Sequence, residues 1–338
     1  MKKLRLAGFQ KDSTCINNII SMKIIPNRNT FFVLLACGFA VIMIMAAGID
    51  YQWTMALHGL ERQGFTDLMG RTMFEGDLPS PNDLIIFIYS GFVLLYVLAN
   101  LARENSSLHP WRPQLGFIVV SGLVTAFGMV HSLKWVIGRV RPNDLLKHDL
   151  PYSEWFEFGA YFITEGSPKG SFPSGHTAQA FMLMSVAYVL AGDPRHSRRL
   201  KQAGMILGTV VIVFALAMGV SRSMSLHHWI SDWLGSIFLS WIIIHALYYW
   251  IIKVPEQALV FSARQSGPKP ARFRELVLCL VIFVFILGSI MFLTGFRSLF
   301  LAATLWLALL IPLGLIGIVV SWKLSRVLVK TPDQTAAD

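Results

Sequence analysis

Charged side chains are scarce in this sequence of 338 residues, where they make up 14% of the chain. Soluble globular domains carry about 25% charged residues. Apolar side chains take up 54% of the chain instead, and the mean hydropathy is +0.57. These proportions exclude an ordinary soluble domain and predict a protein that is embedded in lipid.

Cysteine is also rare, with three residues in the whole chain. Cys15 precedes the first long apolar segment, whereas Cys37 and Cys279 fall inside such segments. No two of them are placed for a bridge on the oxidising side of a membrane. We therefore expect no structural disulfide.

Long apolar runs are what the sequence does contain. A helix that crosses a membrane needs about 20 mostly apolar residues. Eight segments meet or approach this length, and a total of seven or nine stays open because the segment boundaries are uncertain by a few residues. They predict an all-α, polytopic bundle of transmembrane helices over residues 31–49, 84–101, 114–133, 176–192, 203–220, 230–252, 276–294 and 299–322.

Basic residues orient this bundle through the positive-inside rule. Most of the 29 lysines and arginines lie before the first segment or in connections that alternation places on the same side, which predicts a cytoplasmic N-terminus. A second group falls on the outer side, where a binding site for an anion is the simplest explanation. Nothing indicates nucleic-acid binding. The outer group consists of Lys134, Arg139, Arg141, Lys147, Lys169 and Arg222.

The first polar cluster is KWVIGRVRP at residues 134–142. Lys134 and Arg141 are seven residues apart, about two helical turns, so both can face one way if the helix continues that far. Pro142 disfavours helix at Arg141 and predicts that the helix ends near it. The two cations can bind an anion, or they can simply reach toward the membrane surface.

The second cluster is PSGH at residues 173–176, directly before the fourth apolar segment. Ser174 can cap the following helix, and Gly175 lets the backbone approach a ligand closely. The free N–H groups of a helix N-terminus bind anions, and His176 would stand beside such an anion. The alternative is a capped helix with an incidental interfacial histidine.

The third cluster is SRSMSLHHWISD at residues 221–232. Asp232 follows His228 by four residues, so the two share a helix face and the carboxylate can orient one ring nitrogen. The same offset from His227 reaches Ser231, which cannot do this. His228 is therefore the candidate nucleophile or base, and a purely structural His–Asp pair is the alternative.

The predicted topology brings these three clusters to one membrane face. Together they supply two or three cations, a helix N-terminus, one oriented histidine and a second histidine. This set is what phosphoryl transfer through a covalent phosphohistidine requires.

The three clusters resemble the type 2 phosphatidic acid phosphatase superfamily. Its pattern is Lys, six residues, Arg-Pro; then Pro-Ser-Gly-His; then Ser-Arg, five residues, His, three residues, Asp. Every position matches, from Lys134 to Arg141 and Pro142, from Pro173 to His176, and from Ser221 and Arg222 to His228 and Asp232. The resemblance covers residues 84–250 and extends to the first segment.

The resemblance implies a role for each matched residue. His228 attacks phosphorus, Asp232 fixes its tautomer, and His176 protonates the leaving oxygen and then activates water. Phosphate oxygens are held by the other members of the pattern. The resemblance implies no metal and no other cofactor, which fits the lack of a carboxylate cluster suited to Mg²⁺ or Zn²⁺. The implied phosphate-binding residues are Lys134, Arg141, Arg222, Ser174 and Gly175.

The same resemblance divides the chain. Residues 1–30 form a cytoplasmic tail, residues 31–252 a six-helix phosphatase core, and residues 253–338 an extension of two further helices and a short tail.

Aromatic residues in the long connection 143–172 either anchor it in the headgroup layer or form a lid that selects the lipid. Helical spacing of Phe65, Leu68, Met69 and Met73 predicts a short amphipathic helix. His131 and His245 are interpreted as packing residues, with support of Lys134 as a second possibility for His131.

We therefore predict an integral membrane lipid phosphatase of a bacterial inner membrane, with its site facing the periplasm or exterior. Its partner is a lipid phosphate of the lipid A, undecaprenyl diphosphate or phosphatidylglycerophosphate class. A lipid phosphotransferase with the same site is the closest alternative. A vanadate-binding haloperoxidase, which is soluble, and a non-catalytic membrane transport or structural protein are more distant ones.

Overall fold

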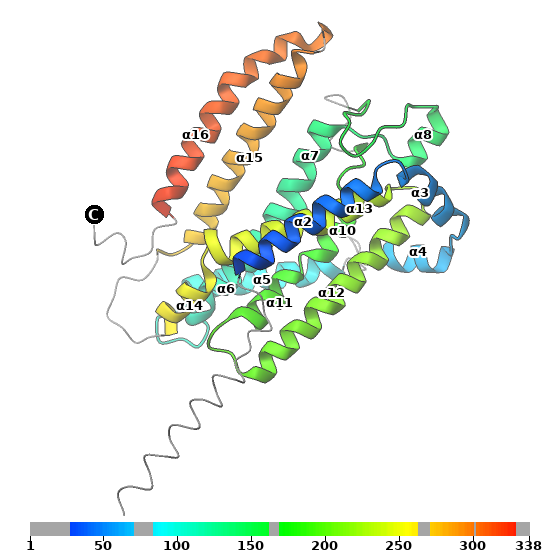
Figure 1. Ribbon diagram of the computed structural model, residues 1–338. Helices are drawn as coiled ribbons and strands as arrows, with labels where there is room; N and C mark the ends of the chain where they lie inside the picture. The colour runs from blue at the N-terminus through cyan, green and yellow to red at the C-terminus, as the bar shows by residue number, and fades with distance from the viewer. Residues whose placement is uncertain (1–27, 71–83, 162–168, 263–270, 301, 329–338) are drawn as a thin grey trace, which may run out of the picture.

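The computed structural model of the chain describes residues 28–70, 84–161, 169–262, 271–300 and 302–328. All regular elements in these ranges are helical, which confirms the predicted all-α bundle (Figure 1). Most of the tail predicted over residues 1–30 lies outside the described residues, as do Met73, Phe162 and Cys15. Cys37 and Cys279 are both free thiols.

The elements follow one another as helices of very different length. The longer ones lie at a slant to one another in Figure 1. In chain order they are α2 (Arg28–Ala46), α3 (Asp50–Gly59), α4 (Gln63–Gly70), α5 (Leu84–Leu101), η1 (His109–Trp111), α6 (Arg112–Gly122), η2 (Leu123–Met129), α7 (Val130–Ile137), α8 (Pro142–His148), α10 (Gly175–Phe181), α11 (Met184–Gly192), α12 (Arg198–Met224), α13 (Ile230–Ala246), η3 (Leu247–Ile251), α14 (Val254–Ser262), α15 (Arg274–Ser298), η4 (Ala302–Leu309) and α16 (Leu310–Leu328).

Within the described residues, seven helical segments are long and apolar enough to cross a membrane. The remaining predicted segment, 176–192, forms the two short helices α10 and α11. They meet at a tight turn in which Ser185 N donates to the carbonyl of Met182 (3.0 Å) and Val186 N to that of Leu183 (3.0 Å). The predicted amphipathic helix over Phe65, Leu68 and Met69 is present as α4.

The centre of the bundle is the continuous run α6–η2–α7. In the apolar stretch of this run 72% of the residues are buried, whereas the corresponding stretches of the other spanning segments are 17–44% buried. A π-helical stretch, η2, lies in the middle of the run. Burial on all sides explains why the run is apolar around its whole circumference. It carries Lys134 into the interior at its far end.

Close backbone contacts hold the neighbouring helices in place. A Cβ on Gly219 of α12 would lie 2.4 Å from the ring of Trp233, so only glycine lets that indole of α13 pack on α12. The Trp233 Nε1–H also donates to Ser223 Oγ (3.0 Å). These contacts set the end of α12 against the start of α13, where the third sequence cluster lies.

The connections separate into two groups, as the alternating topology predicts. At one end Arg112 donates to the carbonyl of Ala271 (2.8 Å) and Gln114 to Asp193 (2.7 Å). At the other end His58 Nδ1 lies 2.7 Å from the carbonyl oxygen of Met224. All three sequence clusters are at this second end.

The extension beyond residue 253 forms a hairpin of α15 and α16 that leans away from the other helices in Figure 1. Its two helices approach closely because glycines face each other, and a Cβ on Gly314 would lie 2.5 Å from the carbonyl oxygen of Gly288. The hairpin contacts the core along α6, η2 and α7.

Candidate active site

The turn between α12 and α13 presents His228 to the interior. The backbone N–H groups of His227 and His228 both donate to the carbonyl of Arg222, at 2.9 and 3.2 Å. Ser223 Oγ donates to the carbonyl of His228 (3.1 Å). Four hydrogen bonds, counting that of the Trp233 indole to Ser223, thus hold this turn, and the His228 side chain is 2% exposed.

Asp232 lies beside His228 as the four-residue spacing predicts. Its Oδ2 is 3.4 Å from Nδ1 of His228 and accepts a 2.8 Å hydrogen bond from the backbone N–H of Trp229. The carboxylate therefore caps the start of α13 while it faces the imidazole. Such an arrangement keeps a proton on Nδ1 and leaves Nε2 free. His227 instead places its Nδ1 2.9 Å from Ser225 Oγ.

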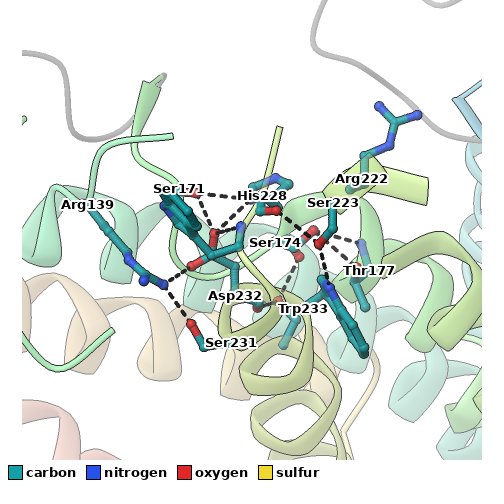
Figure 2. Close-up of polar contacts among 12 residues, drawn as sticks. Arg139, Ser171, Ser174, Thr177, Arg222, Ser223, His228, Ser231, Asp232 and Trp233 are labelled. Carbon is teal, nitrogen blue, oxygen red and sulfur yellow. Dashed lines mark hydrogen bonds and ion pairs between the residues drawn. The ribbon is translucent and has the colours of Figure 1, made fainter. Parts of the chain in front are cut away.

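Sequence reasoning missed a second partner of Asp232, the hydroxyl of Ser171. Ser171 Oγ donates to Oδ2 of Asp232 and lies 3.5 Å from Nδ1 of His228. Figure 2 shows Ser171 and His228 converging on this carboxylate. The local sequence offers one signal, since Ser171 closely precedes the PSGH cluster.

Arg139 and Asp50 form buried ion pairs behind the site. Sequence reasoning missed Asp50, and it grouped Arg139 with the cations expected to bind an anion, whereas Arg139 pairs with carboxylates of the protein itself. Arg139 Nη1 lies 2.8 Å from Oδ1 of Asp232, and Nη2 lies 2.8 Å from Oδ2 of Asp50. The exposed fraction of all three side chains is 0%. Ser231 also contacts one of these ion pairs: its backbone N–H donates to Asp50 (3.0 Å), and its hydroxyl oxygen accepts from Arg139 (2.7 Å). Buried charges need such partners.

The PSGH segment is tied to α13 from both sides. Ser174 N donates to the carbonyl of Asp232 (3.1 Å), and Ser236 Oγ donates to the carbonyl of Ser174 (2.8 Å). Ser174 caps α10 as expected, with its Oγ accepting from the backbone N–H (3.4 Å) and hydroxyl (3.1 Å) of Thr177. Gly175 and His176 begin this helix and are half-buried.

Lys134 and Arg141 do not share one helix. Helix α7 ends at Ile137 because Gly138 adopts a left-handed conformation (φ 60°), which glycine takes without a steric cost. Arg141 has an extended backbone, and Pro142 begins the next helix, α8, instead of marking the end of one. Even so, Lys134 lies within electrostatic range of Arg141 and Asp232, and Arg141 within range of Arg222.

These charges act on His228. Burial lowers the pKa of the His228 imidazole well below 6.5, and the positive charges of Lys134 and Arg141 and the nearby His176 and His227 lower it further. A neutral imidazole results, which is the form that can donate an electron pair. Five of the eight predicted site residues therefore lie near one another, namely His228, Asp232, Lys134, Arg141 and His176.

The aromatic connection covers this end of the bundle. Tyr152 packs edge-on against Trp229 (5.0 Å between ring centres), and the Trp155 indole donates to the carbonyl of Met43 (3.0 Å). Arg297 of α15 donates to the carbonyls of Val136 (2.9 Å) and Gly159 (3.2 Å). Arg297 thereby joins the hairpin to the connection.

Comparison with protein families agrees with this geometry. Residues 115–255 match the family model of the PAP2 superfamily. The match confirms the resemblance to type 2 phosphatidic acid phosphatases, and the matched segment contains all eight predicted site residues. With the apolar helices, it identifies a membrane protein of the phosphatase type. Comparison with curated proteins and with solved structures gives no match.

Proposed function

We propose that this protein hydrolyses a lipid phosphate at the outer face of a bacterial inner membrane, through a phosphohistidine on His228. The substrate is a phosphomonoester or diphosphate of the lipid A, undecaprenyl diphosphate or phosphatidylglycerophosphate class. The observation that carries the proposal is the environment of His228, which has a carboxylate 3.4 Å from one ring nitrogen and the cations Lys134 and Arg141 close enough to lower its pKa.

The first half of the reaction transfers phosphorus to His228. Asp232 holds the proton on Nδ1, so the lone pair of Nε2 attacks phosphorus while the bond from phosphorus to the leaving oxygen breaks. His176 donates its proton to that oxygen. Lys134, Arg141 and Arg222 hold the non-bridging oxygens, whose charge is spread in the transition state.

The second half restores the histidine. His176, now neutral, takes a proton from water as the water oxygen attacks phosphorus, and the bond between phosphorus and Nε2 breaks. Inorganic phosphate leaves, and His228 is neutral again. The backbone N–H of Gly175 and the hydroxyl of Ser174 add donors for the phosphate at the start of α10.

The location of these residues supports a lipid as the substrate. They lie at the ends of apolar helices long enough to cross a membrane, the depth at which a lipid headgroup meets water. The outer face is proposed because the inner connections carry most of the basic residues outside the site.

The test is release of inorganic phosphate by the purified protein from a panel of lipid phosphates, with EDTA present. We expect release that is lost in His228→Ala and retained in His227→Ala, the matched neighbour. Equal release by wild type and His228→Ala would contradict the proposed nucleophile. Consumption of substrate only when an acceptor lipid is added, with no free phosphate, would indicate a phosphotransferase instead.

A further inference from the structure

Two apolar cavities flank the line along which α15 contacts the central helix. One, of about 670 Å³, lies among η2, α7, α15 and the start of α16, and the other, of about 770 Å³, lies among η2, α7, α13, η3, α15 and α16. Aliphatic and aromatic side chains make up most of both linings, and the second cavity also has Lys253 and Arg326 in its lining. Ser132, Ile286 and Ile290 line both cavities.

Each cavity reaches the helical turn that carries Lys134. His131 and Trp135 line the first cavity, and Leu133 and Val136 line the second. His131 is one turn before Lys134, and its ring packs on that of Phe127 (4.8 Å between ring centres). Lys134 itself lines neither cavity, but both cavities reach the residues next to it on α7.

The first cavity is long enough to hold a hydrocarbon chain of one leaflet of a bilayer. On α15 the first runs from Leu280 to Thr294, about 21 Å at 1.5 Å per residue. The hydrocarbon core of a bilayer is about 30 Å thick, so half of it is about 15 Å. A hydrocarbon chain of one leaflet fits this length, with its polar end toward Lys134.

The end of the hairpin nearest the site is held in place beside the first cavity. Thr294 of the first cavity lies one turn before Arg297, the residue whose guanidinium donates to the carbonyls of Val136 and Gly159 and stacks on Phe158 (4.3 Å). The same side chain thus holds both the end of α7 and the connection over the site.

We propose that the C-terminal hairpin and the central helix form the binding site for the hydrocarbon chains of the lipid phosphate substrate. The inference rests on the proposed function and gives the two additional helices a role in substrate binding. A ligand with an anionic head and a hydrocarbon tail is the chemistry that fits a cationic site beside an apolar groove. Chain binding orients the headgroup, and misplacement of reacting groups by about 1 Å costs about 100-fold in rate.

The first experiment measures binding without turnover. Phosphatidic acid with a diazirine at the end of one acyl chain is incorporated in trace amounts into phosphatidylcholine nanodiscs that contain the His228→Ala protein. After irradiation, labelled peptides are compared with those from a phosphatidylcholine probe carrying the same chain. We expect several-fold stronger labelling of residues 280–294 by phosphatidic acid, reduced by inorganic phosphate. Equal labelling by both probes would mean that the groove holds only bulk lipid, and would overturn the proposal.

The second experiment fills both cavities with Ile290→Trp. The matched control is Ile206→Trp, which adds the same ring to an exposed position of α12 (66% exposed) outside both cavities. We expect about a tenfold fall in kcat/KM for dipalmitoyl phosphatidic acid, mainly through KM, with dibutyryl phosphatidic acid turned over as by wild type. No effect, or an equal loss on both substrates, would overturn the proposal.

The two experiments separate this inference from the proposed reaction. Selective labelling without any release of phosphate would support the groove and contradict hydrolysis. Release of phosphate with equal labelling by both probes would support hydrolysis and contradict the groove.

Discussion

Arg139 joins two carboxylates that come from distant parts of the chain, Asp50 and Asp232. Its Nη1 lies 2.8 Å from Asp232 and its Nη2 2.8 Å from Asp50, with none of the three side chains exposed. The start of α3 is thereby connected to the carboxylate that faces His228. A planar guanidinium can bind two partners in this way, whereas an ammonium group acts as a point charge.

Substitution Arg139→Lys tests whether this pairing positions Asp232. The variant keeps the positive charge but has one nitrogen in place of the two that pair with Asp50 and Asp232, so we expect kcat to fall by about 10–100-fold with little change in KM. Arg195→Lys is the control, because Arg195 pairs with Asp193 at the opposite end of the bundle. A wild-type kcat in Arg139→Lys would show that Asp232 is oriented without it. Full removal in Arg139→Met should destabilise the fold by about 3–5 kcal/mol, since it leaves two buried carboxylates without their partner.

The pH profile tests the electrostatics of His228. Burial and the charges of Lys134 and Arg141 lower the pKa of this imidazole, so it stays neutral until the pH falls well below 6.5. We expect the acidic limb of kcat/KM to lie below pH 6.5, because kcat/KM reports ionisations of the free enzyme. Lys134→Met removes one of the positive charges that lower the pKa of His228, so the acidic limb should move to higher pH. Lys134→Arg keeps the charge and should leave the limb in place. All three proteins are compared on one substrate, so that ionisation of the substrate affects each profile equally. Identical acidic limbs in all three would contradict the assignment of the limb to His228.

His176 is expected to act in both halves of the reaction. In His176→Ala, turnover of a lipid phosphate should fall by about 100–10,000-fold, the range for loss of a general acid or base. With p-nitrophenyl phosphate the leaving group needs no proton. The variant should then release one equivalent of p-nitrophenol in a burst and accumulate phosphohistidine, detectable by mass spectrometry. A steady rate without a burst would place His176 outside the hydrolysis of the intermediate.

Gly159 tests the contact between the aromatic connection and the motif that carries Arg139. A Cβ at this position would lie 2.3 Å from the carbonyl oxygen of Gly138 and 2.6 Å from Cα of Arg139. Since both are backbone atoms, Gly159→Ala must displace one segment, and we expect a loss of about 1–3 kcal/mol in the free energy of unfolding. Gly59→Ala, where a Cβ meets nothing within 4 Å, is the control. Equal melting temperatures of the two variants in detergent would contradict the close contact.

The all-α bundle and most of its segments could be predicted because each helix that crosses a membrane must satisfy its own backbone and be apolar along its length. The predicted segment 84–101 coincides with α5. The break between α10 and α11 could not be predicted, because residues 182–183 are apolar like their neighbours. The helix was expected to end near Arg141, and it ends earlier, at Ile137, because the left-handed Gly138 follows it.

Local spacing by itself determined the pair His228 and Asp232 and the cap at Ser174, since residues four apart share a helix face and a cap acts within one turn. Only the tertiary structure decided that Asp50, Arg139 and Ser171 complete the surroundings of Asp232, and that Arg297 reaches the connection over the site. Asp50 and Arg139 are 89 residues apart, and Gly159 and Arg297 are 138 apart. Contacts over such separations depend on how whole helices pack, and a single sequence carries no periodic pattern that records them.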